Sequence, residues 1–269
     1  MDSAYGGIGY FWAAILGLVQ GLAEFLPVSS SGHLALVERL GMGVPAPAAF
    51  DVFLHLATIA VVIVYFRSAI RWYIRNDPLA LGYVVAASVP TGLVGILFKD
   101  SLEALRLSPN MICLGLLVTA ALLFATEILR GAGYQIRDLG WFGAVTVGFC
   151  QALAIVPGIS RSGATIAGAV LCGVDRKEAF GFSFILSIPA VLGAALLHVR
   201  EMLHSGEAET VFDWASIGPL LLGCAVAAAA GYAALRILER VVIAGRLAWF
   251  AAYCCLVAVA GLVYFNFFN

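Results

Sequence analysis

The chain has 269 residues, of which 62% are hydrophobic and 12% are charged, with 15 Lys and Arg against 16 Asp and Glu. Soluble domains carry about 45–50% apolar and about 25% charged residues, so this composition excludes a soluble enzyme and a disordered chain. Because its charges are balanced, the chain also lacks the basic surface that a nucleic-acid-binding protein needs. The sequence therefore predicts an all-α polytopic membrane protein with no nucleic-acid partner.

The first apolar stretch, residues 8–41, is too interrupted to be a simple membrane span. It contains Glu24, Pro27 and a polar run of three serines, glycine and histidine at 29–33. This pattern predicts two half-length helices around a polar break, which is typical of a re-entrant hairpin. Uninterrupted apolar stretches follow, close to the ~20 residues that cross a bilayer, at 51–66, 79–98 and 110–129.

The second half of the chain repeats this order. Residues 140–173 are interrupted by Pro157-Gly158 and by Ser160-Arg161-Ser162-Gly163, and three further spans follow at 179–199, 215–235 and 247–267. A shift of 131 residues aligns Gly17 with Gly148, Gln20 with Gln151, Ser29 with Ser160 and Ser31 with Ser162. We therefore expect one membrane domain built by duplication, with repeat 1 at about 8–130 and repeat 2 at about 139–268.

Each repeat holds three spans, and because three is odd the second copy must be inverted. The positive-inside rule predicts the orientation from the loop cations. With the N-terminus outside, the inside loops hold ten: Arg67, Arg71, Arg75, Arg130, Arg137, Arg176, Lys177, Arg236, Arg240 and Arg246. The outside loops hold four, Arg39, Lys99, Arg106 and Arg200. We expect both termini outside, and an inverted-topology repeat of six transmembrane helices plus two re-entrant hairpins whose tips meet within the bilayer.

The expected hairpin tips carry a carboxylate and a guanidinium. Gln20 and Glu24 are four residues apart and share one helix face, and an intramembrane carboxylate indicates function, although Glu24 could serve only to pair with Arg161. An unpaired guanidinium costs about 2.5–3.5 kcal/mol at a bilayer centre, so Arg161 must meet a carboxylate, a phosphate or water. Two helix N-termini beside Arg161 predict a phosphate or diphosphate site.

Hydroxyl and imidazole groups accompany these charges. Ser29, Ser30 and Ser31 can cap the returning helix, and at least one of them is expected to be only a cap. His33 follows one turn later and favours acid/base chemistry, with a structural histidine as the alternative. Farther from the polar breaks, His55 is a weaker candidate for the surroundings of the site.

Two stretches resemble the motifs of the BacA-type undecaprenyl-diphosphate phosphatases. Gln20-Gly-Leu-Ala-Glu24-Phe-Leu-Pro-Val-Ser-Ser-Ser-Gly-His33 is similar to the family's (E/Q)xxxE stretch followed by Pro-x-Ser-Ser-x-Gly-His. Pro157-Gly-Ile-Ser-Arg-Ser-Gly-Ala-Thr165 is similar to the second motif, PGxSRSxxT. Length, hydropathy and motif spacing fit over essentially the whole chain. Position 20 is Gln where many members have Glu, so Gln20 cannot act as an acid, a base or a charged metal ligand.

The resemblance implies an enzyme that hydrolyses undecaprenyl diphosphate to undecaprenyl phosphate and phosphate. This reaction recycles the carrier lipid of cell-wall synthesis, and it implies a site open to the outer face of the bacterial plasma membrane and a link to bacitracin resistance. Arg161 would hold the diphosphate together with Ser160, Ser162 and Thr165, and with Gln20 and Ser29. Further, Ser30 would be the nucleophile, His33 the acid/base, and Glu24 a ligand of Mg²⁺ or Ca²⁺ or the activator of the nucleophile.

Two alternatives stay open at this point. A metal-activated water can replace Ser30 as the nucleophile, because phosphoryl transfer depends mostly on positioning and charge stabilisation. A transporter of polyprenyl phosphates is the competing class, because broken helices in an inverted repeat are a transporter design. The lipid substrate is the expected partner, and a homodimer remains an option.

Overall fold

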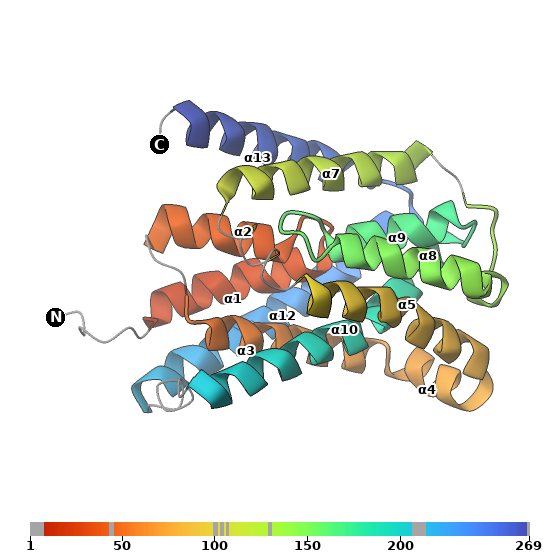
Figure 1. Ribbon diagram of the computed structural model, residues 1–269, viewed down its shortest axis with the longest axis horizontal. Coiled ribbons are helices and arrows are strands. Elements are labelled where there is room, and N and C mark those ends of the chain that lie inside the picture. Colours follow the sequence, from red (N-terminus) through yellow and green to blue (C-terminus); the bar gives the residue numbers. More distant parts are fainter. Residues whose placement is uncertain are drawn as a thin grey trace.

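The computed structural model describes residues 8–42, 46–98, 102, 105, 108–128, 131–205 and 214–267, which are predominantly helical. The elements in chain order are α1 (Tyr10–Phe25), α2 (Ser30–Val37), the π-helix η1 (Glu38–Met42), α3 (Ala48–Tyr65), α4 (Arg67–Asn76), α5 (Pro78–Leu97), α7 (Pro109–Ile128), the 3-10 helix η2 (Ile136–Asp138), α8 (Gly140–Leu153), α9 (Arg161–Leu171), α10 (Arg176–Ser205), α12 (Trp214–Ile243) and α13 (Ala248–Phe267) (Figure 1). The prediction of an all-helical protein is confirmed.

Five of the helices are long and apolar enough to cross a membrane: α5, α7, α10, α12 and α13. A sixth span results if α3 and α4, which meet at a 65° bend, are counted together. The bend falls at Phe66, directly before the arginine-rich segment of α4, where the apolar run ends. All six predicted spans fall on these helices, so the chain is a multi-pass membrane protein. The expected span 215–235 is too short, because α12 continues through charged residues to Ile243.

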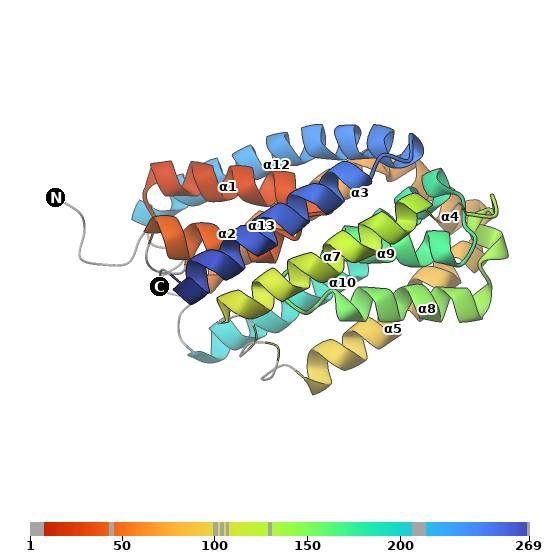
Figure 2. The ribbon, with the colours of Figure 1, turned by 90° about the horizontal axis from the view of Figure 1, so that it is seen from above.

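Helices from the two halves of the chain pack on each other in matching pairs. α1 lies along α12 and α8 lies along α5, while α7 packs on α13 and α3 on α10 (Figure 2). Glycines make the first two contacts close: a Cβ on Gly17 would lie 2.4 Å from the carbonyl oxygen of Gly223, and one on Gly148 would lie 2.5 Å from that of Ala87. Small residues allow membrane helices to approach at this distance. Gly17 and Gly148, aligned by the 131-residue shift, therefore serve the same purpose.

The two pairs of short helices lie in different halves of the molecule. α1 and α2 lie in one half of the bundle and α8 and α9 in the other, as both views show. α1 begins and α13 ends at one end, whereas α4, η2 and the start of α10 lie at the other (Figure 1). The cations Arg67, Arg71 and Arg75 lie on α4 and so belong to that second end; Lys99, Arg106 and Arg130 lie outside the described residues.

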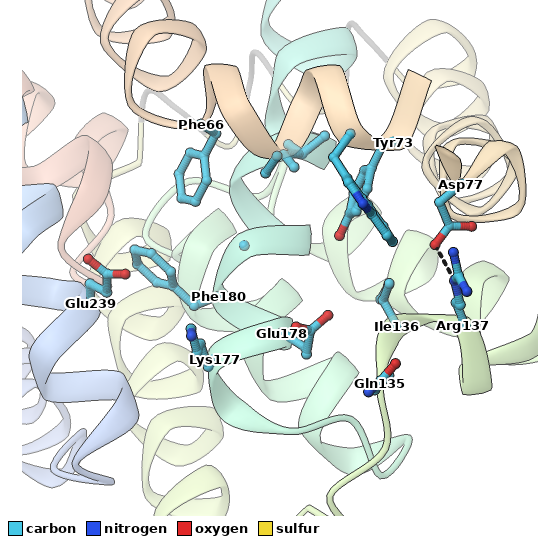
Figure 3. Close-up of a pocket in the computed structure, with 14 residues that line it drawn as sticks. Phe66, Tyr73, Asp77, Gln135, Ile136, Arg137, Lys177, Glu178, Phe180 and Glu239 are labelled. Carbon is cyan, nitrogen blue, oxygen red and sulfur yellow. Dashed lines mark hydrogen bonds and ion pairs between the residues drawn. The ribbon is translucent and has the colours of Figure 1, made fainter. Parts of the chain in front are cut away.

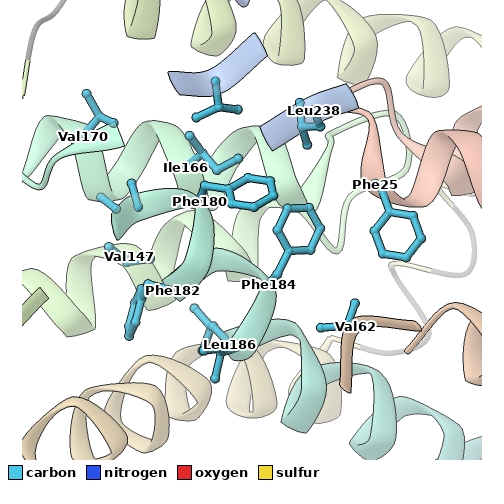
Figure 4. Packing of buried hydrophobic residues seen from close by; sticks show 14 of the residues in the cluster. Phe25, Val62, Val147, Ile166, Val170, Phe180, Phe182, Phe184, Leu186 and Leu238 are labelled. Atoms are coloured by element: carbon cyan, nitrogen blue, oxygen red, sulfur yellow. The ribbon is translucent and has the colours of Figure 1, made fainter. Parts of the chain in front are cut away.

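Aromatic rings fill the core between α1, α3 and α10. The Phe184 ring centroid lies 5.8 Å from that of Phe25 and 5.0 Å from that of Phe180 (Figure 4), and 6.0 Å from that of Phe66. Three of these side chains are fully buried, and Phe66 is nearly so. We call Phe25, Phe66, Phe180 and Phe184 the phenylalanine layer, and it supports the tips of the hairpins from one side.

Candidate active site

The turn between α1 and α2 gives two neighbouring serines, Ser29 and Ser30, different hydrogen-bond partners. α1 ends at Phe25, before Pro27, which cannot donate a helical hydrogen bond. Ser29 has φ 70°, a left-handed conformation that residues with side chains rarely adopt and that gathers at functional sites. Its Oγ accepts from the Gly32 amide at 3.4 Å, so Ser29 is the cap of α2. The hydroxyl of Ser30, the first residue of α2, does not cap the helix and instead donates to Glu24.

The turn between α8 and α9 is fixed by its contact with α7. Gly158 has φ 89°, and a Cβ there would lie 2.1 Å from the carbonyl oxygen of Ile112, so only glycine fits. Thr119 of α7 accepts from the Ser160 amide at 2.8 Å and donates to the Gly158 carbonyl at 2.9 Å. Ser160 caps α9 by accepting from the Gly163 amide at 3.2 Å. The sequence pattern did not identify Thr119, because it lies in an uninterrupted apolar span.

Glu24 is the centre of the polar cluster where the two turns meet. Its Oε1 accepts from Arg161 Nη2 at 2.8 Å, and its Oε2 accepts from Ser30 Oγ at 2.7 Å and from Gln20 Nε2 at 3.3 Å. The Glu24 side chain is only 8% exposed. Charge-assisted hydrogen bonds of this kind are among the strongest in proteins, so they hold the carboxylate in one orientation with the Ser30 hydroxyl on its Oε2.

Arg161 connects the second turn to the first, although it follows Glu24 by 137 residues. Its Cζ lies 5.8 Å from the centroid of the Phe184 ring, within the range of a cation–π contact. Its Nη1 is buried without a hydrogen-bond partner among the described residues, and the same holds for Gln20 Oε1. Buried donors without acceptors are costly, so a ligand with oxygen acceptors fits this guanidinium.

The remaining residues of the second motif join the two turns. Ser162 Oγ donates to the Phe25 carbonyl at 3.1 Å and lies 3.2 Å from Ser160 Oγ. Thr165 Oγ1 donates to the Arg161 carbonyl at 2.8 Å. All three hydroxyl-bearing residues are buried, and their contacts fix the backbone that carries Arg161.

Two histidines lie at the cluster, and their contacts differ. The ring nitrogens of His33 contact the Ser29 carbonyl at 2.9 Å and the Tyr253 hydroxyl at 2.8 Å, and not Ser30. His55 lies closer to the charges, with Nε2 3.6 Å from Glu24 Oε2. The weak ranking of His55 reflects its position on a separate apolar helix. No signal in the sequence marks Tyr253.

A pocket of about 380 Å³ lies apart from this polar cluster (Figure 3). Phe66 and Phe180 line it, together with Tyr73, Lys177 and Glu178. Glu24, Ser30 and Arg161 are not among its lining residues. The pocket therefore shares two side chains with the phenylalanine layer but none with the polar cluster around Glu24.

Fold and site together define a multi-pass membrane protein with a buried polar cluster of Glu24, Ser30 and Arg161 where two interhelical turns meet. The chain belongs to the family described as "Bacitracin resistance protein BacA", whose model matches residues 13–260. This membership confirms the resemblance seen in the two motifs.

Several curated relatives, each named undecaprenyl-diphosphatase, are similar over nearly their full length. The protein of Carboxydothermus hydrogenoformans is 37% identical, covering 94% of this chain and 96% of the relative. The protein of Desulfatibacillum aliphaticivorans is 39% identical, with 93% and 96% covered. The protein of Alcanivorax borkumensis is 40% identical, with 86% and 91% covered.

Proposed function

We propose that the protein is an undecaprenyl-diphosphatase of the bacterial plasma membrane. It hydrolyses undecaprenyl diphosphate to undecaprenyl phosphate and phosphate, which renews the carrier lipid for cell-wall synthesis. The observation that carries the proposal is the contact of Ser30 Oγ with Glu24 Oε2 at 2.7 Å, beside a guanidinium with unpaired donors. A hydroxyl next to a buried carboxylate is the arrangement that nucleophilic catalysis requires.

The reaction on this site begins with binding of the diphosphate by Arg161. Glu24 takes the Ser30 proton as Oγ attacks the terminal phosphorus, the bond to the bridging oxygen breaks, and undecaprenyl phosphate leaves. Water then attacks the phosphoserine while His33 takes its proton, the bond between Ser30 Oγ and phosphorus breaks, Glu24 returns its proton to Ser30, and phosphate is released. Arg161 stabilises the charge on the equatorial oxygens in both steps. The hydroxyls of Ser29, Ser160, Ser162 and Thr165 hold the two turns around the phosphates.

A divalent ion, Mg²⁺ or Ca²⁺, is part of this proposal. Glu24 and the buried, unpartnered Oε1 of Gln20 offer hard oxygen donors on one helix face, which fits such an ion. Arg161 and Ser30 already engage both Glu24 oxygens, so Glu24 and Gln20 alone would hold the ion only weakly without oxygens from the diphosphate. When bound, the ion neutralises charge on the diphosphate.

A transporter of polyprenyl phosphate needs the anion site but no activated hydroxyl, so phosphate release separates the two functions. We expect the purified protein in detergent to release orthophosphate from undecaprenyl diphosphate in a colorimetric assay. EDTA should suppress the release, and added Mg²⁺ or Ca²⁺ should restore it. Substrate that stays intact in the presence of either ion would contradict the phosphatase and favour the transporter.

We also propose that the fold is an inverted repeat with two re-entrant hairpins. The matching helix pairs support it: exchange of the halves 8–130 and 139–268 converts the α1–α12 contact into the α8–α5 contact and leaves α7–α13 and α3–α10 unchanged. The equivalent close approaches at Gly17 and Gly148 support it as well. In this arrangement the hairpin α1–α2 enters from outside, and its entrance leads the substrate headgroup to Glu24.

The proposed topology has both termini and the site entrance outside. Single cysteines in a chain that lacks its six native cysteines can test it with a membrane-impermeant thiol reagent on whole cells. We expect labelling at Ser205→Cys and at Ser101→Cys, a position outside the described residues, but not at Asn76→Cys or Gln135→Cys, because the cation-rich end stays inside. Labelling of the second pair alone would reverse the orientation.

A further inference from the structure

His33 is bound at both ring nitrogens, and one of its partners comes from the last helix. The Ser29 carbonyl, 2.9 Å from Nδ1, can only accept, so Nδ1 carries a hydrogen. Nε2 then holds the lone pair and accepts from the Tyr253 hydroxyl at 2.8 Å. The two rings are also stacked, with centroids 5.6 Å apart and an interplanar angle of 14°. Tyr253 therefore occupies the nitrogen through which His33 can exchange a proton.

The packing of α13 fixes the position of this tyrosine. Its neighbour Cys254 is fully buried, with Sγ 3.7 Å from the Pro27 carbonyl in the turn between α1 and α2. Farther along α13, Asn266 and Asn110 pair their side-chain amides and tie α13 to α7. Two consecutive residues of α13 thus contact the first turn, which holds the Tyr253 hydroxyl at His33 rather than leaving it to rotate on the surface.

We propose that Tyr253 takes part in the phosphatase reaction as the hydroxyl that orients His33 and relays protons to and from its Nε2. When His33 acts as a base, the Tyr253 proton passes to Nε2 while the tyrosine oxygen takes a proton from the attacking water. Tyr253 ends unchanged, His33 carries the proton, and the water oxygen bonds to phosphorus. A phenol hydroxyl suits this role because it both donates and accepts. Tyr253 is 44% exposed, so its ring lies at the edge of the helix bundle and is not enclosed by side chains.

This inference rests on the proposed role of His33, so the test combines both residues. Phosphate release is measured with wild type, Tyr253→Phe, His33→Gln and the double variant. Tyr253→Phe keeps the stacked ring, and we expect its kcat to fall about tenfold with KM within about twofold of wild type. His33→Gln should fall about 100-fold, and the double variant should be no slower than His33→Gln, because Tyr253 acts through His33.

Tyr264→Phe is the matched control, because Tyr264 lies on the same helix, is also 44% exposed and has its ring against Phe265. It should keep the wild-type kcat. A wild-type kcat for Tyr253→Phe, or losses that multiply in the double variant, would overturn the role of Tyr253 alone. A wild-type kcat for His33→Gln would overturn the role of His33 in the proposed mechanism, and the inference with it.

Discussion

Arg161→Lys is expected to lower kcat/KM by ~100-fold or more, about 3 kcal/mol of transition-state stabilisation. Lysine keeps the positive charge, so the contact with Glu24 and the folded protein should survive. It loses the planar fork that binds one group with Nη2 and another with Nη1. In this site Nη2 is engaged by Glu24 at 2.8 Å and Nη1 is the unpartnered donor. The lysine variant therefore cannot hold the carboxylate and a phosphate oxygen in the same geometry.

Steady-state phosphate release by the purified variant measures this loss. Arg137→Lys serves as the control. Arg137 pairs with Asp77 at 2.7 Å, and both residues line the pocket that lies apart from the Glu24 cluster. We expect this control to keep wild-type kcat/KM. If Arg161→Lys were as active as the control, Arg161 would have no catalytic role and would serve only to join the two hairpins.

Ser30→Ala is expected to abolish turnover while substrate binding stays measurable. The variant loses the hydroxyl that attacks phosphorus, but Glu24 keeps its contacts with Arg161 and Gln20. Covalent catalysis has no route without the nucleophile, so the effect falls on kcat rather than on binding. Turnover is followed by phosphate release, and binding by the rise in unfolding temperature that the lipid produces.

The neighbouring serines provide the comparison for this variant. Ser29 caps α2, and Ser31 Oγ lies 3.4 Å from Ser29 Oγ, so neither hydroxyl contacts Glu24. In Ser29→Ala and Ser31→Ala we expect turnover to decline by only about 1 kcal/mol of activation free energy, which is the energy scale of a helix cap. An equal and modest decline in all three alanine variants would exclude Ser30 as the nucleophile and favour a metal-activated water.

Features with a local sequence signal could be predicted. The spans follow from apolar runs whose length matches the bilayer, and the two turns follow from Pro, Gly and Ser runs inside such stretches. The approach of Glu24 and Arg161 could be predicted because buried charges in a membrane need partners. The length of α12 could not, since its charged final turns resemble a loop in composition although they remain helical to Ile243.

The contacts of the site that depend on packing gave no such signal. Thr119, His55 and Tyr253 each stand in an uninterrupted apolar run, where a hydroxyl or imidazole resembles an ordinary helix residue. Their positions at the turns depend on which helices pack together and in which rotation, for example α7 against the Gly158 turn. This information resides in the side-chain fit between helices that are distant in sequence, which periodicity does not encode.

The phenylalanine layer bears on the permeability of the membrane to ions around the site. In the proposed topology these rings pack beside Arg161, whose Cζ lies 5.8 Å from the centroid of the Phe184 ring, and they face the arginine-rich end of the bundle through the pocket that Phe66 and Phe180 line. Phe180 and Phe184 are fully buried and in edge contact, and rings packed in this way exclude water and oppose the passage of charge. Dense apolar packing next to the buried guanidinium and carboxylate therefore makes the passage of ions beyond the site unfavourable. The rings that contact Arg161 thus also oppose the movement of ions past it.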